Sequence, residues 1–380
     1  MAVSVFPSSS ASASGEVTTY YGITAAGTYT VDLPAGIYDL TSTSEVTVGG
    51  QSVNGTLDLA VFAAGISTLE TPSAGVQWTQ QSPLFDGRQI NGIAYGNELY
   101  VAVGYWYDGG WKGRITTSPD GTTWTARTSP FGGIYINDVI YGNGLFVAVG
   151  DDANAATSPD GITWTLRSGI GDDDINSVTY GNGLFVSCGD YGEIATSSDG
   201  ASWTARTANV GNNYLLTTTY GDGLFVAAGN SGNLTTSPDG TTWTVRTSGF
   251  GSSHIKGLTY GDGLYVAVGA SGTITTSPDG TTWTARTSGF GSSYINDATY
   301  SSGLFVAVGD GGKLETSPDG ITWTGQAPGF GQYTEIDCAA SGGGLFLAGS
   351  NDGKLATSKT FAEGGIRLSI TPKTPSVILP

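Results

Sequence analysis

Short apolar segments alternate with polar turns along most of the chain. The clearest apolar segment, close to Tyr-Gly-Asn-Gly-Leu-Phe-Val-Ala-Val-Gly, occurs seven times. In one copy, residues 136–141 predict a first strand, Asn143-Gly144 predicts a tight hairpin turn, and residues 145–149 predict a second strand that is apolar on both faces. Such a strand is expected to lie between two neighbouring sheets. The seven copies start at Tyr95, Tyr141, Tyr180, Tyr220, Tyr260, Tyr300 and, in degenerate form, Ser341.

A polar turn motif recurs between these segments. Ser-x-Asp-Gly, followed by two residues and Trp, occurs six times at intervals of 39 or 40 residues. Ser and Asp oxygens accept backbone N–H bonds in a tight turn, and Gly supplies the strained position. Around Asp160, residues 155–157 predict a third strand and residues 164–167 a fourth. The aspartates are Asp120, Asp160, Asp199, Asp239, Asp279 and Asp319, and the tryptophans are Trp124, Trp164, Trp203, Trp243, Trp283 and Trp323.

A period near 40 residues in an all-β chain indicates one four-stranded β-propeller blade per repeat. The last repeat ends at residues 357–360 without the turn or its Trp, whereas Trp78-Thr79-Gln80-Gln81 precedes the first strand 1. We therefore expect residues 78–81 to complete the seventh blade as its outer strand, which closes the ring and removes two open sheet edges. The prediction is an all-β, seven-bladed propeller over residues 76–360 with a split last blade.

Ser-Pro-Asp-Gly-Thr-Thr-Trp resembles the Asp-box, or BNR repeat, of sialidases, sortilin-type receptors and photosystem assembly factors. It is one residue shorter than the usual Ser-x-Asp-x-Gly-x-x-Trp. In those families the motif is a structural turn, so the resemblance implies the fold and not an activity. The near-identical repeats are also similar to β-propellers of phage tail or head-fibre proteins and of bacterial surface structures. That resemblance implies a structural protein of the virion surface or, alternatively, of the bacterial cell surface.

The pattern changes outside the repeats. In residues 1–75, short segments at 28–33, 37–40, 45–48 and 57–61 predict a small N-terminal β-domain, either sandwich-like or a half-barrel. We expect this domain to anchor the protein to other virion or appendage proteins. Residues 361–380 predict one further strand, at 366–370, and a Pro-containing tail.

The amino-acid composition excludes several classes of fold, partner and binding site. Charged residues make up only 12% of the chain, which excludes helical bundles and coiled coils. The net charge of −18 argues against nucleic acid and anionic lipid as partners, and no apolar run is long enough for a membrane span. A single histidine and two cysteines argue against a histidine-based metal site and a disulfide framework. We therefore expect no metal, no cofactor and no membrane insertion, and we expect Cys188 and Cys338 to be core thiols.

Two positions near the start of strand 1 vary between repeats. Strand 1 is innermost, so both are expected to face the mouth of the central channel, where aromatic, amide and carboxylate groups suit sugar binding. Variable loop residues without a ligand are the alternative. The first ring is Gln89, Tyr135, Asp174, Tyr214, His254, Tyr294 and Glu335, and the second is Asn91, Asn137, Asn176, Leu216, Lys256, Asn296 and Asp337.

The loop over residues 105–113 has six extra residues and contains two tryptophans outside the repeat. Exposed Trp and Tyr together favour a contact with a glycan, a subunit or a partner, and the alternative is that they cover the edge of their own blade or pack on the N-terminal domain. The candidate contact residues are Tyr105, Trp106, Tyr107, Trp111, Tyr135, Asp174, Tyr214, His254, Tyr294 and Tyr333.

Three hypotheses of function follow. The first is a non-enzymatic virion or appendage protein that binds a host-surface glycan or a partner protein; whether it forms a homo-oligomer stays open. The second is a glycoside-processing enzyme, which needs two carboxylates such as Asp174 with Glu335 or Asp337. A sialidase-like enzyme needs three arginines that converge at the central mouth and a Tyr/Glu nucleophile pair. The recurrent arginines here are expected on outer strands and we identify no such pair, so we expect no enzyme. The third is an assembly-factor propeller, for which a signal or lipid-anchor cysteine near the start is expected and none is present.

Overall fold

The computed structural model divides the chain into two compact units. One unit is Gln77–Lys359, and the other combines Met1–Val76 with Thr360–Pro380. Residues 78–81, 87–107, 109–167 and 170–359 are described with their side chains, and the second unit is described only by the backbone pairing of its strands. Of the helices in the described part of the chain, none is long and apolar enough to cross a membrane.

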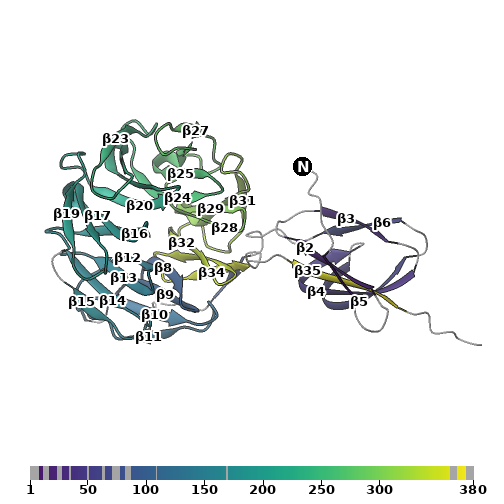
Figure 1. Ribbon diagram of the computed structural model, residues 1–380. Coiled ribbons are helices and arrows are strands. Elements are labelled where there is room, and N and C mark those ends of the chain that lie inside the picture. Colours follow the sequence, from purple (N-terminus) through teal and green to yellow (C-terminus); the bar gives the residue numbers. More distant parts are fainter. Residues whose placement is uncertain are drawn as a thin grey trace, which may run out of the picture. The chain divides into compact units, whose positions relative to one another are not determined.

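The larger unit is a ring of seven four-stranded antiparallel blades (Figure 1). The innermost strands are β8 (Ile90–Gly96), β12 (Ile136–Gly142), β16 (Ile175–Gly181), β20 (Leu215–Gly221), β24 (Ile255–Gly261), β28 (Ile295–Ser301) and β32 (Ile336–Gly342). The second strands are β9 (Leu99–Tyr107), β13 (Leu145–Gly150), β17 (Leu184–Gly189), β21 (Leu224–Gly229), β25 (Leu264–Gly269), β29 (Leu304–Gly309) and β33 (Leu345–Ser350).

The outer half of each blade follows the same order. The third strands are β10 (Trp111–Ser118), β14 (Asn154–Ser158), β18 (Glu193–Ser197), β22 (Asn233–Ser237), β26 (Ile274–Ser277), β30 (Lys313–Ser317) and β34 (Leu355–Lys359). The fourth strands are β11 (Thr125–Arg127), β15 (Thr165–Arg167), β19 (Thr204–Thr207), β23 (Thr244–Thr247), β27 (Thr284–Arg286), β31 (Thr324–Gln326) and β7 (Thr79–Gln80). Short 3-10 helices join the second and third strands of blades three to six: η1 (Asp190–Gly192), η2 (Asn230–Gly232), η3 (Ala270–Gly272) and η4 (Asp310–Gly312).

The predicted closure of the ring is confirmed. Strand β7 pairs with β34 of the seventh blade, so the sheet that ends the propeller takes its outer strand from the start. The N–H of Gln81 donates to the carbonyl of Leu355 at 2.8 Å, and its side-chain amide donates to Thr357 Oγ1 at 2.9 Å. All seven sheets are therefore four-stranded, as the repeat count predicts.

The core lies between the blades. Each second strand is buried on both faces, and one cluster joins Val101 and Val103 of blade one to Val139, Phe146 and Ala148 of blade two. These apolar side chains fill the space between adjacent twisted sheets, as close packing of a protein interior requires. Stability therefore depends on contacts between neighbouring blades as well as on those within each sheet.

The repeated Asp turns are internally satisfied. Asp160 Oδ1 accepts from the N–H groups of Ile162 and Thr163, both at 2.8 Å, and from Ser158 Oγ at 2.9 Å. The Thr163 bond is the largest cause that lowers the pKa of Asp160 to about 2. Trp164 Nε1 closes the turn by donating to the Gly161 carbonyl at 2.9 Å. Because the carboxylate is used within the turn, this aspartate has a structural role.

The smaller unit contains strands from both ends of the chain. The order in its sheet is β1-β2-β35-β4-β6-β3, and β5 pairs with β4. The C-terminal strand thus lies between two N-terminal strands, a pairing that the sequence analysis did not anticipate. The strands are β1 (Ser8–Ala11), β2 (Val17–Ile23), β3 (Thr28–Leu33), β4 (Gly36–Val48), β5 (Gln51–Val61), β6 (Gly65–Glu70) and β35 (Ile366–Lys373).

Candidate functional site

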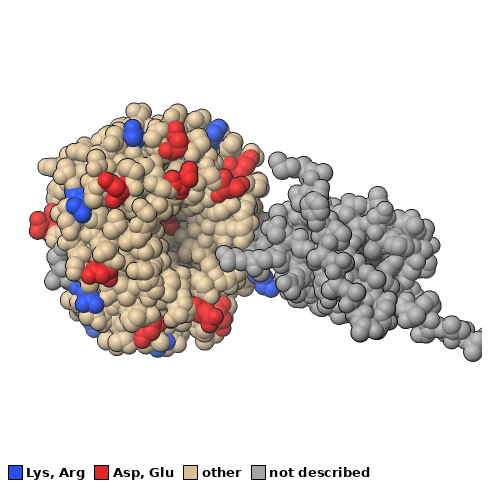
Figure 2. Space-filling view, viewed as in Figure 1, with Lys and Arg blue, Asp and Glu red and all other residues tan. Residues whose placement is uncertain are grey.

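The innermost strands surround a central cavity of about 750 Å³. The space-filling view shows it as a hollow in the middle of the propeller (Figure 2). All seven residues of the second ring line the cavity, as the sequence predicts. In the first ring, Gln89 and Tyr135 line it, whereas the other five, all in the described part of the chain, do not. The cavity wall is thus formed by the whole second ring but by only two residues of the first ring, although all seven first-ring residues directly precede an innermost strand.

The amides of the second ring hold neighbouring blades together. Asn137 Nδ2 donates to Asp151 Oδ1 of its own blade at 2.8 Å and to the Ile175 carbonyl of the next blade at 3.0 Å. Asn176 and Asn296 make the equivalent pairs of bonds in blades three and six. The amide N–H donors of these residues are used in hydrogen bonds within the propeller, which weakens the sequence-based argument that they bind sugar.

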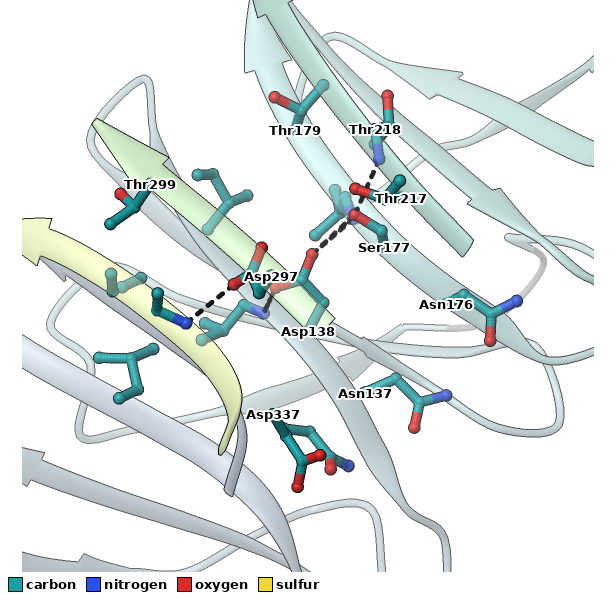
Figure 3. A pocket seen from close by; sticks show the side chains of 18 of the residues that line it. Asn137, Asp138, Asn176, Ser177, Thr179, Thr217, Thr218, Asp297, Thr299 and Asp337 are labelled. Carbon is teal, nitrogen blue, oxygen red and sulfur yellow. Dashed lines mark hydrogen bonds between the residues drawn. The ribbon is translucent and has the colours of Figure 1, made fainter. Parts of the chain in front are cut away.

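Two aspartates that the sequence analysis missed lie in the cavity wall (Figure 3). Asp138 Oδ1 accepts from the N–H of Val139 at 2.7 Å, and its Oδ2 accepts from Val178 N and Ser177 Oγ of the next blade, both at 3.0 Å. Asp297 bonds in the same way to Ala298 N at 2.7 Å and to Ala339 N of the next blade at 2.9 Å.

A glycine in the preceding blade makes room for each of these aspartates. A Cβ at Gly92 would lie 3.1 Å from Asp138 Oδ1, and a Cβ at Gly257 would lie 2.8 Å from the Cα of Asp297. The sequence contains a signal for this contact: one repeat has glycine and the next repeat has aspartate at the equivalent position. The pairing indicates a structural role for both carboxylates.

Burial away from water is the largest influence on the pKa of the Asp138 and Asp297 carboxyl groups. It raises the pKa of Asp138 to about 6 and that of Asp297 to about 7, although the hydrogen bonds described above act in the opposite direction. Both groups therefore hold a proton more tightly in the folded protein than in the unfolded chain.

We expect the free energy of unfolding to fall as the pH rises from about 5 to 8. A carboxyl group with a raised pKa in the folded state gives full stabilisation below its unfolded value of 3.8 and loses it as the pH rises through its folded value. The combined change from these two groups is about 4 kcal/mol, because they lose about one and two pKa units of stabilisation over this window at about 1.4 kcal/mol per unit, and it is measurable by urea unfolding. The free energy of unfolding of an Asp138→Asn/Asp297→Asn variant should depend less on pH in this window. A wild-type protein that gains stability from pH 5 to 8 would contradict the raised pKa values of these two groups.

The seventh blade departs from the amide pattern. It has Asp337 in place of Asn, and Cys338 Sγ donates to the Ile90 carbonyl of blade one at 3.5 Å. Burial, followed by the nearby Glu335 carboxylate, raises the pKa of Asp337 to about 7. The Oδ2 atom of Asp337 is buried and has no hydrogen-bond partner. The carboxylate of the second ring therefore has one acceptor that the fold does not use.

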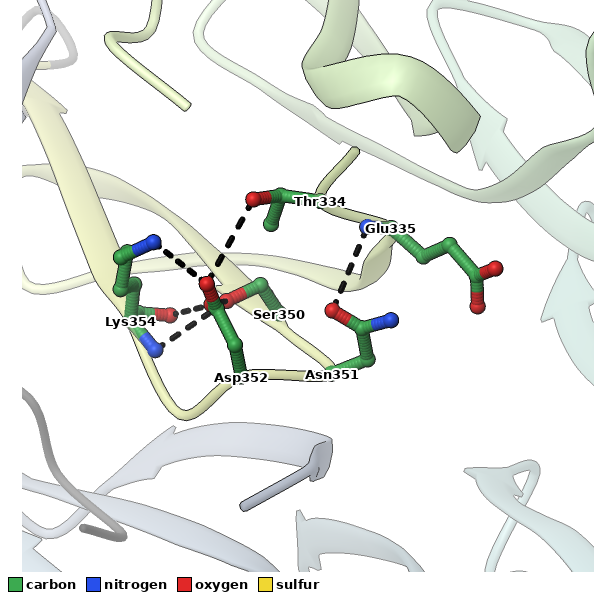
Figure 4. A network of polar contacts seen from close by, with 6 residues as sticks. All are labelled: Thr334, Glu335, Ser350, Asn351, Asp352 and Lys354. Carbon is green, nitrogen blue, oxygen red and sulfur yellow. Dashed lines mark hydrogen bonds and ion pairs between the residues drawn. The ribbon is translucent and has the colours of Figure 1, made fainter. Parts of the chain in front are cut away.

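The loop next to Asp337 is a polar network (Figure 4). Asp352 pairs with the Lys354 ammonium and accepts from Ser350 Oγ at 2.7 Å. Asn351 Oδ1 accepts from the N–H of Glu335 at 3.3 Å. These bonds fix the turn between β33 and β34, while the side chain of Glu335 stays exposed. The Asp352 carboxylate is thus neutralised by its ion pair with Lys354.

Four of the predicted contact residues form one aromatic cluster beside the cavity. Tyr105 stacks on Tyr135 with ring centroids 4.4 Å apart, and Trp111 meets Tyr105, Tyr107 and Tyr135 edge-on at 5.3, 5.2 and 5.6 Å. Tyr105 and Tyr135 line the cavity, whereas Tyr107 is 51% exposed and Trp111 44% exposed. The Arg88 guanidinium lies 5.8 Å from the Trp111 ring.

The remaining candidates are distributed around the rim. Tyr214 is exposed and packs edge-on at 5.3 Å against Tyr191, an exposed ring in η1 that the sequence analysis missed. Tyr294 lies 4.9 Å from the Lys256 ammonium, and Tyr333 is 91% exposed. His254 is exposed, and Asp174 Oδ1 accepts from the N–H of Asp152 at 2.9 Å. Trp106 lies apart from the aromatic cluster and contacts Arg114 and Lys112.

Cys188 and Cys338 are buried free thiols, as expected for core positions. Within the described ranges, no group of three or more His, Cys, Asp or Glu side chains is arranged to hold a metal ion.

Comparisons with known proteins support the fold. No protein-family model and no curated protein matches the sequence. The structure is similar to YCF48 from Cyanidioschyzon merolae (TM-score 0.59, 15% identity, 74% of this chain and 98% of that one). It is also similar to YCF48 bound to D1 peptide (TM-score 0.60, 17% identity, 76% and 96%). A third similar structure is a catalytically inactive virginiamycin B lyase from Staphylococcus aureus with quinupristin (TM-score 0.66, 10% identity, 75% and 99%). At these identities the similarity establishes a seven-bladed β-propeller and nothing about activity.

Proposed function

We propose that this protein is a non-enzymatic binding and structural module whose propeller contacts a neutral glycan through the blade-one hairpin. The observation that carries the proposal is the aromatic cluster of Tyr105, Tyr107, Trp111 and Tyr135, which exposes two rings beside the central cavity. Large aromatic surfaces with polar edges are well suited to stacking on the C–H faces of sugar rings.

The cluster is held rigidly, which favours binding. Tyr105 donates its hydroxyl hydrogen to Gln89 Oε1 at 2.8 Å and is stacked on Tyr135, so its ring is held in place against the edge-on ring of Trp111. The Trp111 ring stands nearly perpendicular to Tyr107, at 72°, which gives a ligand two walls of different orientation. A preorganised platform loses little side-chain entropy when a ligand binds.

The location of the protein belongs to the same proposal. The Asp turns and near-identical repeats resemble Asp-box propellers of phage tail or head-fibre proteins, which favours a place at the virion surface. The smaller unit, a compact β-domain that we propose to be sandwich-like, would then attach the propeller to other virion proteins. This assignment rests on the resemblance of the repeats and on the separation of the chain into two units.

A peptide or protein ligand is the second candidate. One of the similar propellers is a YCF48 bound to D1 peptide, so a propeller of this form can hold a peptide. Aromatic rims bind proteins as readily as they bind sugars. The glycan is favoured here because the exposed rings flank a polar cavity, and the net charge of −18 disfavours polyanionic partners.

Substitution of Trp111 tests the proposal. Trp111→Ala is expected to weaken binding to neutral glycans on an array by about tenfold or more, because it removes the central ring of the cluster. Its melting temperature should stay within a few degrees of that of the wild type, since Trp111 is 44% exposed and lies in the hairpin extension outside the repeated blade. Leu166→Ala, at an exposed position of similar accessibility on β15, is the matched control and should bind normally.

Three outcomes separate the alternatives. If wild-type protein binds no neutral glycan but Trp111→Ala loosens a subunit contact in assembled particles, the ligand is a protein. If glycan binding, adsorption and assembly are all unchanged by the substitution, the cluster has no contact role and the proposal is wrong. Hydrolysis of a glycan by the purified protein, abolished by Asp337→Asn, would show an enzyme instead.

A further inference from the structure

The extended hairpin of blade one has two chemically different faces. In the pairing of β9 with β10, Trp111 lies opposite Tyr107 and Lys112 lies opposite Trp106. Because side chains alternate along a strand, the aromatic cluster occupies one face and Trp106 with Lys112 the other. The second face is therefore separate from the residues on which the proposed function rests.

This second face borders a pocket of about 380 Å³. Three of the fourteen Lys and Arg residues in the sequence line it. None of the described lining residues is acidic, and Asp108 lies outside the described part of the chain. The lining residues are Trp106, Lys112, Gly113, Arg114, Ala126, Arg127, Ser129 and Gly132.

The basic side chains are positioned by their surroundings. The Arg114 guanidinium lies 4.6 Å from the centre of the Trp106 ring, and the Lys112 ammonium lies 5.9 Å from it, so the indole restrains both cations. Arg127 Nε donates to Thr117 Oγ1 at 2.8 Å. This hydrogen bond leaves both Nη groups of Arg127, which carry four of the five guanidinium N–H donors, for a ligand.

The pocket is particular to blade one. Arg167, Arg206, Arg246 and Arg286 make the same bond from Nε to a threonine, so the arginine position itself belongs to the repeat. Trp106 and Lys112 come from the extended hairpin, which the other blades lack. The hairpin thus adds an aromatic wall and a cation to an arginine that is already in place.

We propose that this pocket binds one acidic sugar residue, through a carboxylate or sulfate group held by Arg127, Arg114 and Lys112. A pair of oxygens on a carboxylate or a sulfate matches the parallel donors of a guanidinium, and Trp106 offers an apolar wall to the sugar ring. The protein is strongly acidic overall, which disfavours long polyanions. A single acidic residue is compatible with that charge, because fields at the surface are screened within about 10 Å at 0.1 M salt.

Arg127→Gln removes the charge while the scaffold bond is kept. Blade six shows this arrangement already, since Gln326 Nε2 donates to Thr316 Oγ1 at 2.9 Å. Arg286→Gln is the matched control, because Arg286 makes the same threonine bond in blade five without the hairpin. Binding is measured by isothermal titration of the full-length protein with digalacturonic acid, with a 6-sulfated N-acetylglucosamine and with neutral digalactose.

We expect saturable binding of at least one acidic probe, a weakening of about tenfold in Arg127→Gln and in Lys112→Gln, and no change in Arg286→Gln. The two acidic probes distinguish carboxylate from sulfate. Failure of both acidic probes to bind, or equal weakening by Arg286→Gln, would overturn the proposal. Trp111→Ala should leave acidic binding intact, so this result and the test of the proposed function can fail independently.

Discussion

Replacement of Trp78-Thr79-Gln80-Gln81 by Gly-Ser-Gly-Ser is expected to lower the melting temperature by about 10 °C or more and to promote aggregation. The replacement keeps the length of the connection but removes the side chains of the strand that closes blade seven. Gln81 loses its side-chain bond to Thr357, and glycine disfavours the extended pairing with β34. An unpaired β34 edge then becomes available to other copies of the protein.

Calorimetry and light scattering measure the two effects. Thr79→Ser/Gln80→Ser is the control, because both side chains are exposed and the backbone pairing of β7 is retained. The control should melt within a few degrees of the wild type. An unchanged melting temperature and solubility in the four-residue replacement would mean that closure by β7 contributes little to the stability of the ring.

Gly229→Ala should be among the most destabilising single substitutions in the propeller. Gly229 ends β21, where a Cβ would overlap the backbone carbonyl oxygen of Tyr214, and no side chain can move aside to relieve the overlap. Backbone atoms of a packed strand must shift instead, so we expect a loss of about 3 kcal/mol or more in the free energy of unfolding.

Gly325→Ala provides the matched comparison. Gly325 also lies in a strand, β31, but a Cβ there would meet nothing within 4 Å. The substitution should be neutral or should stabilise the protein by up to about 1 kcal/mol, because alanine loses less backbone entropy on folding. Urea unfolding of both variants measures the difference, and equal effects would refute the packing argument.

The repeat pattern was sufficient to predict the blades. Seven copies of the strand 1–2 segment, six Asp turns and an isolated Trp78 fixed both the number of sheets and the way in which the ring closes. Such features are local, because each hairpin and turn is encoded within a few adjacent residues. The aromatic cluster was predictable in composition, since the extra residues of the blade-one loop stand out against the other repeats.

The contacts between blades were harder to predict. Asn137 looked like a ligand-binding amide, but its donors reach a carbonyl about forty residues ahead, in the next blade. Asp138 occupies space left by Gly92 of the preceding blade, and neither residue shows its partner in its own repeat. Pairs of this kind become visible only when one repeat is compared with the following one at the same position. The two faces of the blade-one hairpin likewise required the strand register.

The placement of β35 between β2 and β4 makes the propeller an insertion within a smaller domain. The chain leaves that domain once and returns to it once, so two covalent tethers join the units. A single proteolytic cut in either tether would leave the propeller attached. Both tethers also leave from adjacent strands of one blade, since β7 pairs with β34. A pulling force between the units would therefore act on β7 and β34, two neighbouring strands of the seventh blade. It would not act directly on the other six blades.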